Sequence, residues 1–247
     1  MRGVVVARLA TTQWSRVLAA RDGSETEARR ALEGLCKTYW LPLYAYARSL
    51  GHSAEDASDL TQGFFAYLVE KEILQSVDPS LGRFRSFLFA SIKNFIAHHH
   101  RKEGALKRGG GATTVSLDSA AAEDGITSVP IDTMTPEQVF EYRWGLTVVE
   151  RALDRLAAEW SEEPKSRLFD RLKPHLTGQE PRIPFREIAS DLEMSDVATR
   201  GAMYRLRKRY GQLIRAEIAE TVADEGDIDD EVRHLLSVIG PWESEQQ

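Results

Sequence analysis

Two short amphipathic segments separated by a turn, within residues 183–215, restrict the fold of this chain more than any other feature of its sequence. In each segment apolar residues recur at helical spacing, so each predicts a helix with one face to bury. The stripes are Phe185, Ile188, Ala189 and Leu192 in the first segment and Thr199, Met203, Leu206 and Tyr210 in the second. The stretch 193–195 between them has the length of a tight corner, and Ser195 or Asp196 is placed to cap the second helix. The pattern predicts a helix-turn-helix over residues 184–210.

The second of these helices has a basic face opposite its apolar stripe. Five cations and no acid occur within ten residues: Arg200, Arg205, Arg207, Lys208 and Arg209. A cationic face on the second helix of such a pair suits insertion into the major groove of DNA. An ordinary helical hairpin with a solvated charged face is the alternative, and this stretch alone leaves both open.

The charge of the chain is distributed unevenly along its 247 residues. The formal net charge of -6 argues at first against a nucleic-acid partner. From 83 to 108, however, seven Lys or Arg residues stand against one acid, whereas from 217 to the end ten acids stand against one Arg. The two basic segments therefore predict two local contact surfaces for a polyanion. The acidic segment, with Val232, Leu235, Leu236 and Ile239 spaced as on a short amphipathic helix, predicts surface for something basic.

Several classes of protein are disfavoured by the sequence. No apolar run is long enough to cross a bilayer and the N-terminus has no secretory signal, so we expect a cytoplasmic protein without membrane insertion. The single cysteine, Cys36, excludes an internal disulfide. The consecutive histidines 98–100 point in three directions on a helix and cannot converge on one metal ion. Since no carboxylate set suggests acid–base or metal chemistry, we expect no cofactor, no metal site and no enzymatic activity.

The first hundred residues predict helices throughout. A helical pattern over 25–50 is followed by Ser53 and Asp56, which form a capping box that opens a second helix. The outer face of that helix carries Glu55, Asp59 and Gln62, for which a solvated face is the simplest interpretation. The segment 83–102 then interleaves aromatic and basic residues, a composition that suits unstacked bases beside a phosphate backbone. Most of its aromatic residues are expected in the core, with Arg83, Arg85, Lys93, Asn94, Arg101 and Lys102 outside.

The pattern stops over residues 104–135, which are rich in Gly, Ala, Ser and Thr and predict a flexible linker. Order resumes at Thr135 and Gln138, a second capping box. We therefore expect an all-α fold of two helical domains, 1–103 and 136–215, joined by the linker 104–135 and followed by an acidic extension at 216–247.

Taken together, these features resemble a bacterial RNA polymerase sigma factor of the extracytoplasmic-function group of the sigma-70 family. The residues 59–62, Asp-Leu-Thr-Gln, followed by Phe64 and Phe65, look like that family's polymerase-binding helix. The segment 82–102 looks like its promoter-melting helix. The triplet 187–189, Glu-Ile-Ala, with 205–210, Arg-Leu-Arg-Lys-Arg-Tyr, looks like its C-terminal helix-turn-helix. The resemblance covers roughly residues 12–103 and 136–215.

The resemblance implies a two-part clamp on polymerase and promoter, without catalysis. The first domain would be a sigma region 2 that docks on core RNA polymerase through Asp56, Asp59, Gln62 and Phe65. Its minus-ten contacts would be Arg83, Arg85, Lys93, Asn94, Arg101 and Lys102. The second would be a sigma region 4 that reads the minus-thirty-five element of promoter DNA with Arg200, Gly201, Tyr204, Arg205 and Lys208. An anti-sigma factor or another regulator is a further candidate partner.

Some positions depart from the family's usual pattern and leave alternatives open. Glu193 stands where the turn commonly has Gly, so it either avoids a left-handed conformation or bears strain. A stand-alone helix-turn-helix regulator that never binds polymerase is the alternative function. The charge asymmetry also suggests a hypothesis, that the acidic extension modulates DNA access by competing for the basic faces.

Overall fold

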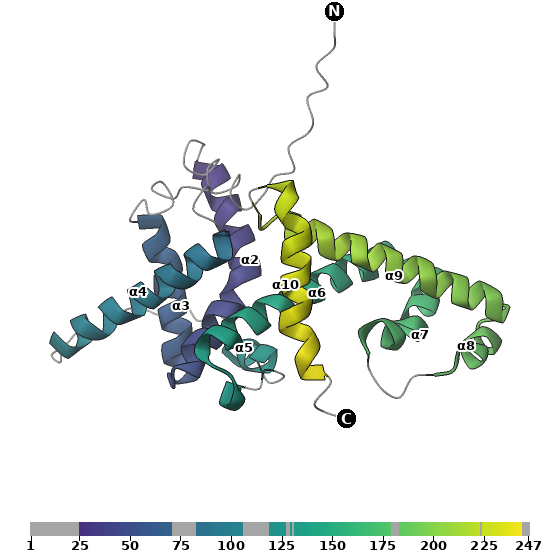
Figure 1. The fold of residues 1–247 in the computed structure, drawn as a ribbon, viewed down its shortest axis with the longest axis horizontal. Coiled ribbons are helices and arrows are strands. Elements are labelled where there is room, and N and C mark those ends of the chain that lie inside the picture. The colour runs from purple at the N-terminus through teal and green to yellow at the C-terminus, as the bar shows by residue number, and fades with distance from the viewer. Residues whose placement is uncertain are drawn as a thin grey trace, which may run out of the picture. The chain divides into compact units, whose positions relative to one another are not determined.

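The protein was analysed as a computed structural model that describes residues 25–70, 83–105, 119–126, 129, 131–178, 183–222 and 224–243. Within these ranges all regular structure is helical and no strand occurs, which confirms the expected all-α class (Figure 1). The elements are α2 (Glu25–Ser49), α3 (Ala54–Glu70), α4 (Phe84–Ala105), α5 (Ser119–Ile126), η3 (Ile131–Thr133), α6 (Pro136–Glu159), α7 (Lys165–Thr177), α8 (Phe185–Asp191), α9 (Asp196–Ala219), η4 (Glu225–Asp227) and α10 (Ile228–Glu243). None of these helices is long and apolar enough to cross a bilayer.

The chain divides into two compact units. Unit 1 comprises Met1–Thr147 and Ile218–Gln247, and unit 2 comprises Val148–Glu217. The boundaries fall inside α6 and α9, so each of these helices begins in one unit and ends in the other. The two functional domains predicted from the sequence, 1–103 and 136–215, have other boundaries than these units. Their assignment stays a prediction.

Local capping fixes the start of two helices in unit 1 as the sequence predicts. The Ser53 hydroxyl accepts a hydrogen bond from the Asp56 backbone N–H at 3.1 Å and donates to the Asp56 carboxylate at 2.7 Å. At the start of α6, the Gln138 N–H donates to the Thr135 hydroxyl at 3.3 Å, and the Gln138 side chain accepts from the Thr135 N–H at 2.8 Å. Thr135 and Gln138 thus form the full capping box, whereas Ser53 caps α3 through its hydroxyl alone. Both caps satisfy donors that the first turn of a helix leaves unpaired.

Large apolar side chains from α2, α3, α4 and α6 are buried in unit 1. They include Leu43, Tyr44, Phe64, Leu88 and Trp144. Ring contacts tie the helices together, with centroids 5.7 Å apart for Tyr39 and Phe84 and 5.7 Å apart for Phe64 and Phe95. As predicted for the segment 83–102, its aromatic and aliphatic stripe supplies core residues, among them Phe84, Leu88, Ile92 and Ile96.

Part of the predicted linker is helical and packed. Glu123 on α5 accepts hydrogen bonds from Tyr44 and, at 2.7 Å, from Arg48, whose guanidinium holds the pKa of the Glu123 carboxyl below its usual value. A Cβ on Gly125 would lie 2.7 Å from a Leu41 methyl, so a larger residue at 125 would require the Leu41 side chain to move. Ile126 joins the same buried cluster. Residues 106–118 of the predicted linker lie outside the described part of the chain.

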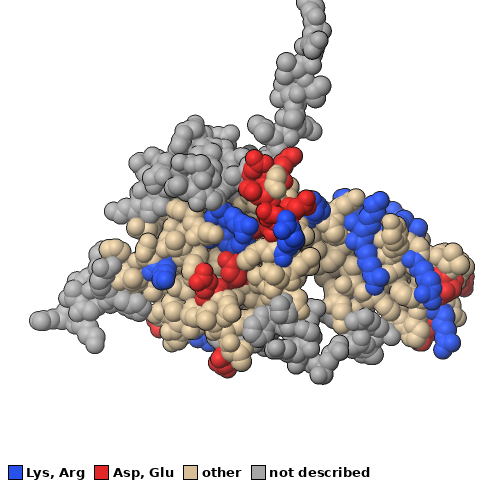
Figure 2. Space-filling model, viewed as in Figure 1, with Lys and Arg blue, Asp and Glu red and all other residues tan. Residues whose placement is uncertain are grey.

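The segment expected to form a short amphipathic helix in the acidic extension is the 16-residue helix α10, which lies beside the first half of α6 (Figure 1). Leu235 is buried, and a Cβ on Gly145 of α6 would lie 2.7 Å from Ile239 and 3.1 Å from Leu235. Glycine at 145 therefore lets the two helices pack closely. Acidic side chains gather where α10 begins (Figure 2).

Unit 2 contains the second half of α6, α7, α8 and most of α9. Its core includes Leu156, Phe169, Ile188, Met203 and Leu206. The buried carboxylate of Glu217 on α9 pairs with Arg151 and Arg155 of α6, each at 2.7 Å. This clamp holds the two long helices together within the unit, because a buried carboxylate is tolerated only when it is paired.

Candidate nucleic-acid interface

Helices α8 and α9 are joined by the four residues Leu192–Ser195. The Met194 N–H donates to the Ala189 carbonyl at 2.8 Å and the Glu193 N–H donates to the Ser190 carbonyl at 3.3 Å, the pair of bonds that defines a Schellman motif. This motif needs a left-handed residue after the helix, and Glu193 supplies it with φ of 52°. Of the two outcomes expected for Glu193, the strained one is therefore observed. The hydroxyl of Ser195 caps α9 by accepting from the Ala198 N–H at 3.1 Å.

The two faces of α9 divide as the sequence predicts. Thr199, Met203 and Leu206 are buried, and Tyr210 is half-buried with its hydroxyl donating to the Val149 carbonyl at 3.0 Å. Burial raises the pKa of Tyr210 to about 12. The opposite face is exposed at Arg200, Tyr204, Arg205 and Lys208, and Gly201 is half-buried between them.

The cations of α9 differ in what surrounds them. Arg200 pairs with Asp196 at 2.8 Å and lies over the Phe185 ring, 5.2 Å from its centroid. Arg209 binds Glu159 with two hydrogen bonds of 2.8 and 2.6 Å, and Arg207 donates to the His175 carbonyl at 3.4 Å. In Figure 2 Lys and Arg side chains are prominent on the surface of the unit that contains these helices. Arg207 and Arg209 thus contact other parts of the chain, and the exposed basic face consists mainly of Arg200, Arg205 and Lys208, as predicted from the sequence.

The polar face of α3 carries the residues predicted to bind polymerase. Asp56 and Asp59 are exposed, and Gln62 is half-buried with its amide donating to the Ser58 hydroxyl at 3.1 Å. Phe65 differs from them because only 7% of its surface is exposed and its ring packs 6.1 Å from that of Phe64. Little of the Phe65 surface is therefore accessible to a partner.

The residues predicted to contact the minus-ten element lie on or next to α4 in unlike surroundings. Lys93 and Asn94 are exposed, Arg83 is half-buried, and Arg85 is buried. Arg101 and Lys102 belong to α4, but their side chains lie outside the described part of the structure. The expectation that these side chains lie outside the core is therefore wrong for Arg85, which the fold buries.

Arg85 is the centre of a buried ionic cluster in unit 1, with 3% of its side chain exposed. Its Nε lies 2.8 Å from a Glu141 oxygen, its Nη1 pairs with Glu231 of α10, and its guanidinium lies 4.1 Å from the centre of the Trp144 ring. Glu231, with 1% of its side chain exposed, also pairs with Arg83 at 3.0 Å. Sequence reasoning missed this cluster because the two carboxylates lie far along the chain and leave no local periodic signal near Arg85.

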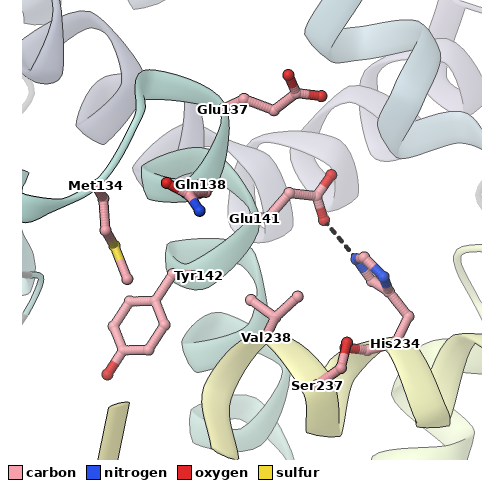
Figure 3. Close-up of a pocket in the computed structure, with 8 residues that line it drawn as sticks. All are labelled: Met134, Glu137, Gln138, Glu141, Tyr142, His234, Ser237 and Val238. Atoms are coloured by element: carbon pink, nitrogen blue, oxygen red, sulfur yellow. Dashed lines mark hydrogen bonds and ion pairs between the residues drawn. The ribbon is translucent and has the colours of Figure 1, made fainter. Parts of the chain in front are cut away.

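A pocket of about 420 Å³ opens between the start of α6 and α10 (Figure 3). In its wall His234 points toward Glu141, with Nε2 and the carboxylate 2.9 Å apart. The remaining lining residues are Met134, Glu137, Gln138, Tyr142, Ser237 and Val238. Among the described residues, no group of three or more His, Cys, Asp or Glu side chains is arranged to hold a metal ion.

The geometry thus defines an all-helical protein with an acidic face on α3, exposed polar and basic residues on α4, and a basic face on a helix that follows a tight turn. In a comparison with protein families, residues 35–105 match the model of sigma-70 region 2. This segment includes most of α2 and all of α3 and α4. Neither the curated proteins nor the solved structures gave a match. The match supports a relation of this part of the chain to the sigma factors of the sigma-70 family.

Proposed function

We propose that this protein is a sigma factor of the extracytoplasmic-function group, which binds core RNA polymerase and directs initiation at specific promoters. The observation that carries the proposal is the sigma-70 region 2 match over residues 35–105, which contains both the acidic face of α3 and the helix α4. The exposed basic face of α9 supports a second DNA contact outside the matched segment. The site of action would be the cytoplasm, and an anti-sigma factor or another regulator would be a further partner.

Polymerase would dock on the exposed carboxylates of α3. Asp56 and Asp59 are exposed on one side of the helix. Gln62 lies one turn after Ser58, and its side-chain amide donates a hydrogen bond to the Ser58 hydroxyl. Charged rim residues steer association and select the partner more than they add affinity. Phe65 would act by supporting the packing beneath this face, since its ring is buried.

The DNA contacts would be made by two separate surfaces. On α4, the exposed Lys93 and Asn94 would face the minus-ten strand, joined by Arg101 and Lys102 on the basis of the sequence alone. On α9, the helix-turn-helix would place its outer face in the major groove of the minus-thirty-five element. The residues of that face are Arg200, Gly201, Tyr204, Arg205 and Lys208. Phosphate contacts would position the helix and base-edge contacts would supply the specificity.

Run-off transcription with core RNA polymerase tests the proposal. Duplex DNA enriched from a random pool by the full chain with polymerase serves as template, and the protein is expected to start transcripts at one position. The Asp59→Lys variant should lose polymerase co-elution because it reverses a charge on the docking face. Asp154→Lys, which reverses an exposed charge on α6, is the matched control and should keep it.

The alternative, a stand-alone helix-turn-helix regulator, gives a different result in the same assay. The wild-type chain would then bind an enriched duplex sequence without co-eluting with polymerase, and no promoter-specific transcript would appear. That outcome would remove the sigma assignment and leave DNA binding by α9 in place.

A further inference from the structure

Two large apolar side chains lie on the exposed face of α9. Val197 is 80% exposed and Tyr204 is 69% exposed, more than the other exposed large apolar residues of the described chain, Leu236 at 60% and Leu50 at 42%. The two are seven positions apart, which is two helical turns, so they lie on one side of the helix about 10 Å from each other along its axis. Neither side chain contributes to the core of unit 2.

Polar and small residues lie between these two side chains along the helix. Arg200 and Gly201 lie on the intervening turn, and Lys208 lies one turn beyond Tyr204. A Cβ on Gly201 would meet only an Arg205 nitrogen at 3.5 Å, so the centre of the face has open space in front of it. The face is therefore a shallow surface with an apolar side chain at each end and cations beside it.

We propose that Val197 and Tyr204 recognise thymine in the minus-thirty-five element through the C5-methyl group. The proposal rests on the proposed binding of α9 to DNA and names residues that determine its specificity. Thymine is the one base that presents a methyl group in the major groove, and apolar side chains are the groups that contact it.

The position of Val197 favours DNA over a protein as the occupant of this face. Val197 is the second residue of α9, and the N-terminal residues of a recognition helix lie nearest the base edges. The cations Arg200 and Lys208 on the same side suit a polyanion. The axial spacing of the two apolar side chains corresponds to about three base pairs, so they would contact separate thymines.

Replacement of thymine by uracil isolates the methyl contact, because uracil lacks only the C5-methyl group. The full chain is bound to the enriched duplex sequence, and each thymine of the upstream element is replaced singly by uracil. Loss of one buried methyl group should weaken binding about fourfold at a position read by Val197. A second sensitive position, about three base pairs away, should belong to Tyr204.

Variants assign each sensitive position to its residue. Val197→Ala should bind thymine and uracil equally at the first position and keep the difference at the second, and Tyr204→Ala should do the reverse. Leu236→Ala, at an exposed apolar residue of α10, is the matched control and should keep both differences. An unchanged thermal unfolding midpoint shows that each variant is folded.

Three results would overturn the proposal. In the first, replacement of thymine by uracil changes the affinity of the wild-type protein by less than twofold at every position. In the second, Val197→Ala and Tyr204→Ala both still prefer thymine to uracil. In the third, the same two variants reduce co-elution with polymerase and leave DNA affinity unchanged, which would show that this face of α9 binds a protein. In these cases specific DNA binding stands. If no duplex sequence is enriched at all, DNA recognition by α9 fails together with the thymine proposal.

Discussion

Arg85 on α4 and Arg205 on α9 are both arginines that the sequence predicts to contact DNA, and the fold places them in opposite surroundings. Arg85 is buried between Glu141, Glu231 and the Trp144 ring. Arg205 is exposed on a face that also carries Arg200 and Lys208. The same residue type therefore serves to join helices in one region and remains available to a partner in the other. What separates the two is whether carboxylates from distant parts of the chain reach the guanidinium.

This difference changes the interpretation of the acidic C-terminal segment. Glu231 of α10 pairs with both Arg83 and Arg85, two residues predicted to contact the minus-ten element. In this conformation α10 therefore keeps Arg85 from DNA, and it also contributes Leu235 to the core of unit 1. The hypothesis that the segment competes for basic faces stays a prediction, and the structure gives α10 a packing role in addition.

The largest expected effect is the loss of stability on removal of Arg85. Arg85→Ala leaves the carboxylate of Glu231 buried without its main partner, which costs about 3–5 kcal/mol. Denaturant unfolding should show the loss, and amide hydrogen exchange should show reduced protection of α10. Arg205→Ala is the control and should change stability by no more than about 0.5 kcal/mol. Equal stabilities of the two variants would contradict the distinction between buried and exposed arginines.

A smaller loss is expected when the charge of Glu231 is removed and its shape is kept. Glu231→Gln retains an acceptor for Arg83 and Arg85, and Glu141 still pairs with Arg85, so the expected loss is about 2 kcal/mol. Denaturant unfolding measures it. Glu225→Gln is the control, because Glu225 is exposed at the start of the same segment. A loss from Glu225→Gln as large as that from Glu231→Gln would show that overall charge, and not the buried cluster, stabilises α10.

The features that the sequence predicted correctly depend on near neighbours. The helix caps at Ser53 and Thr135 join residues three positions apart, and the buried and exposed faces of α9 follow from a period of 3.6 residues. The burial of Arg85 and Phe65 could not be predicted from sequence neighbours, because it depends on packing partners that the fold brings together. The helix α5 was not predicted because seven of its eight residues are small or polar and Ile126 alone carries no periodic signal. The site on α9 was thus more predictable than the site on α4.

Among the exposed cations, Lys208 should matter for DNA and not for stability. Lys208→Ala is expected to weaken binding to specific and non-specific duplexes alike by about 1 kcal/mol, roughly fivefold, if the ammonium contacts a phosphate. The slope of log affinity against log salt should fall by about 0.9. Fluorescence anisotropy at several salt concentrations measures both. Lys165→Ala, at an exposed lysine of α7, is the control and should leave the slope unchanged.

The smallest effect on stability is expected where a carboxylate pairs with an arginine in solvent. Asp196 and Arg200 form an ion pair of 2.8 Å on the surface of α9, with 46% and 62% of their side chains exposed. Asp196→Asn should cost about 0.5 kcal/mol, because solvent screens the pair and the asparagine side chain can still accept a hydrogen bond from Arg200. DNA affinity should rise, since a negative charge leaves the basic face and Arg200 is no longer held by a carboxylate. Unfolding and anisotropy measured on one protein preparation separate the two effects. If Asp196→Asn destabilised the protein as much as Glu231→Gln does, solvent exposure would not be what distinguishes the arginines of α9 from those of the buried cluster.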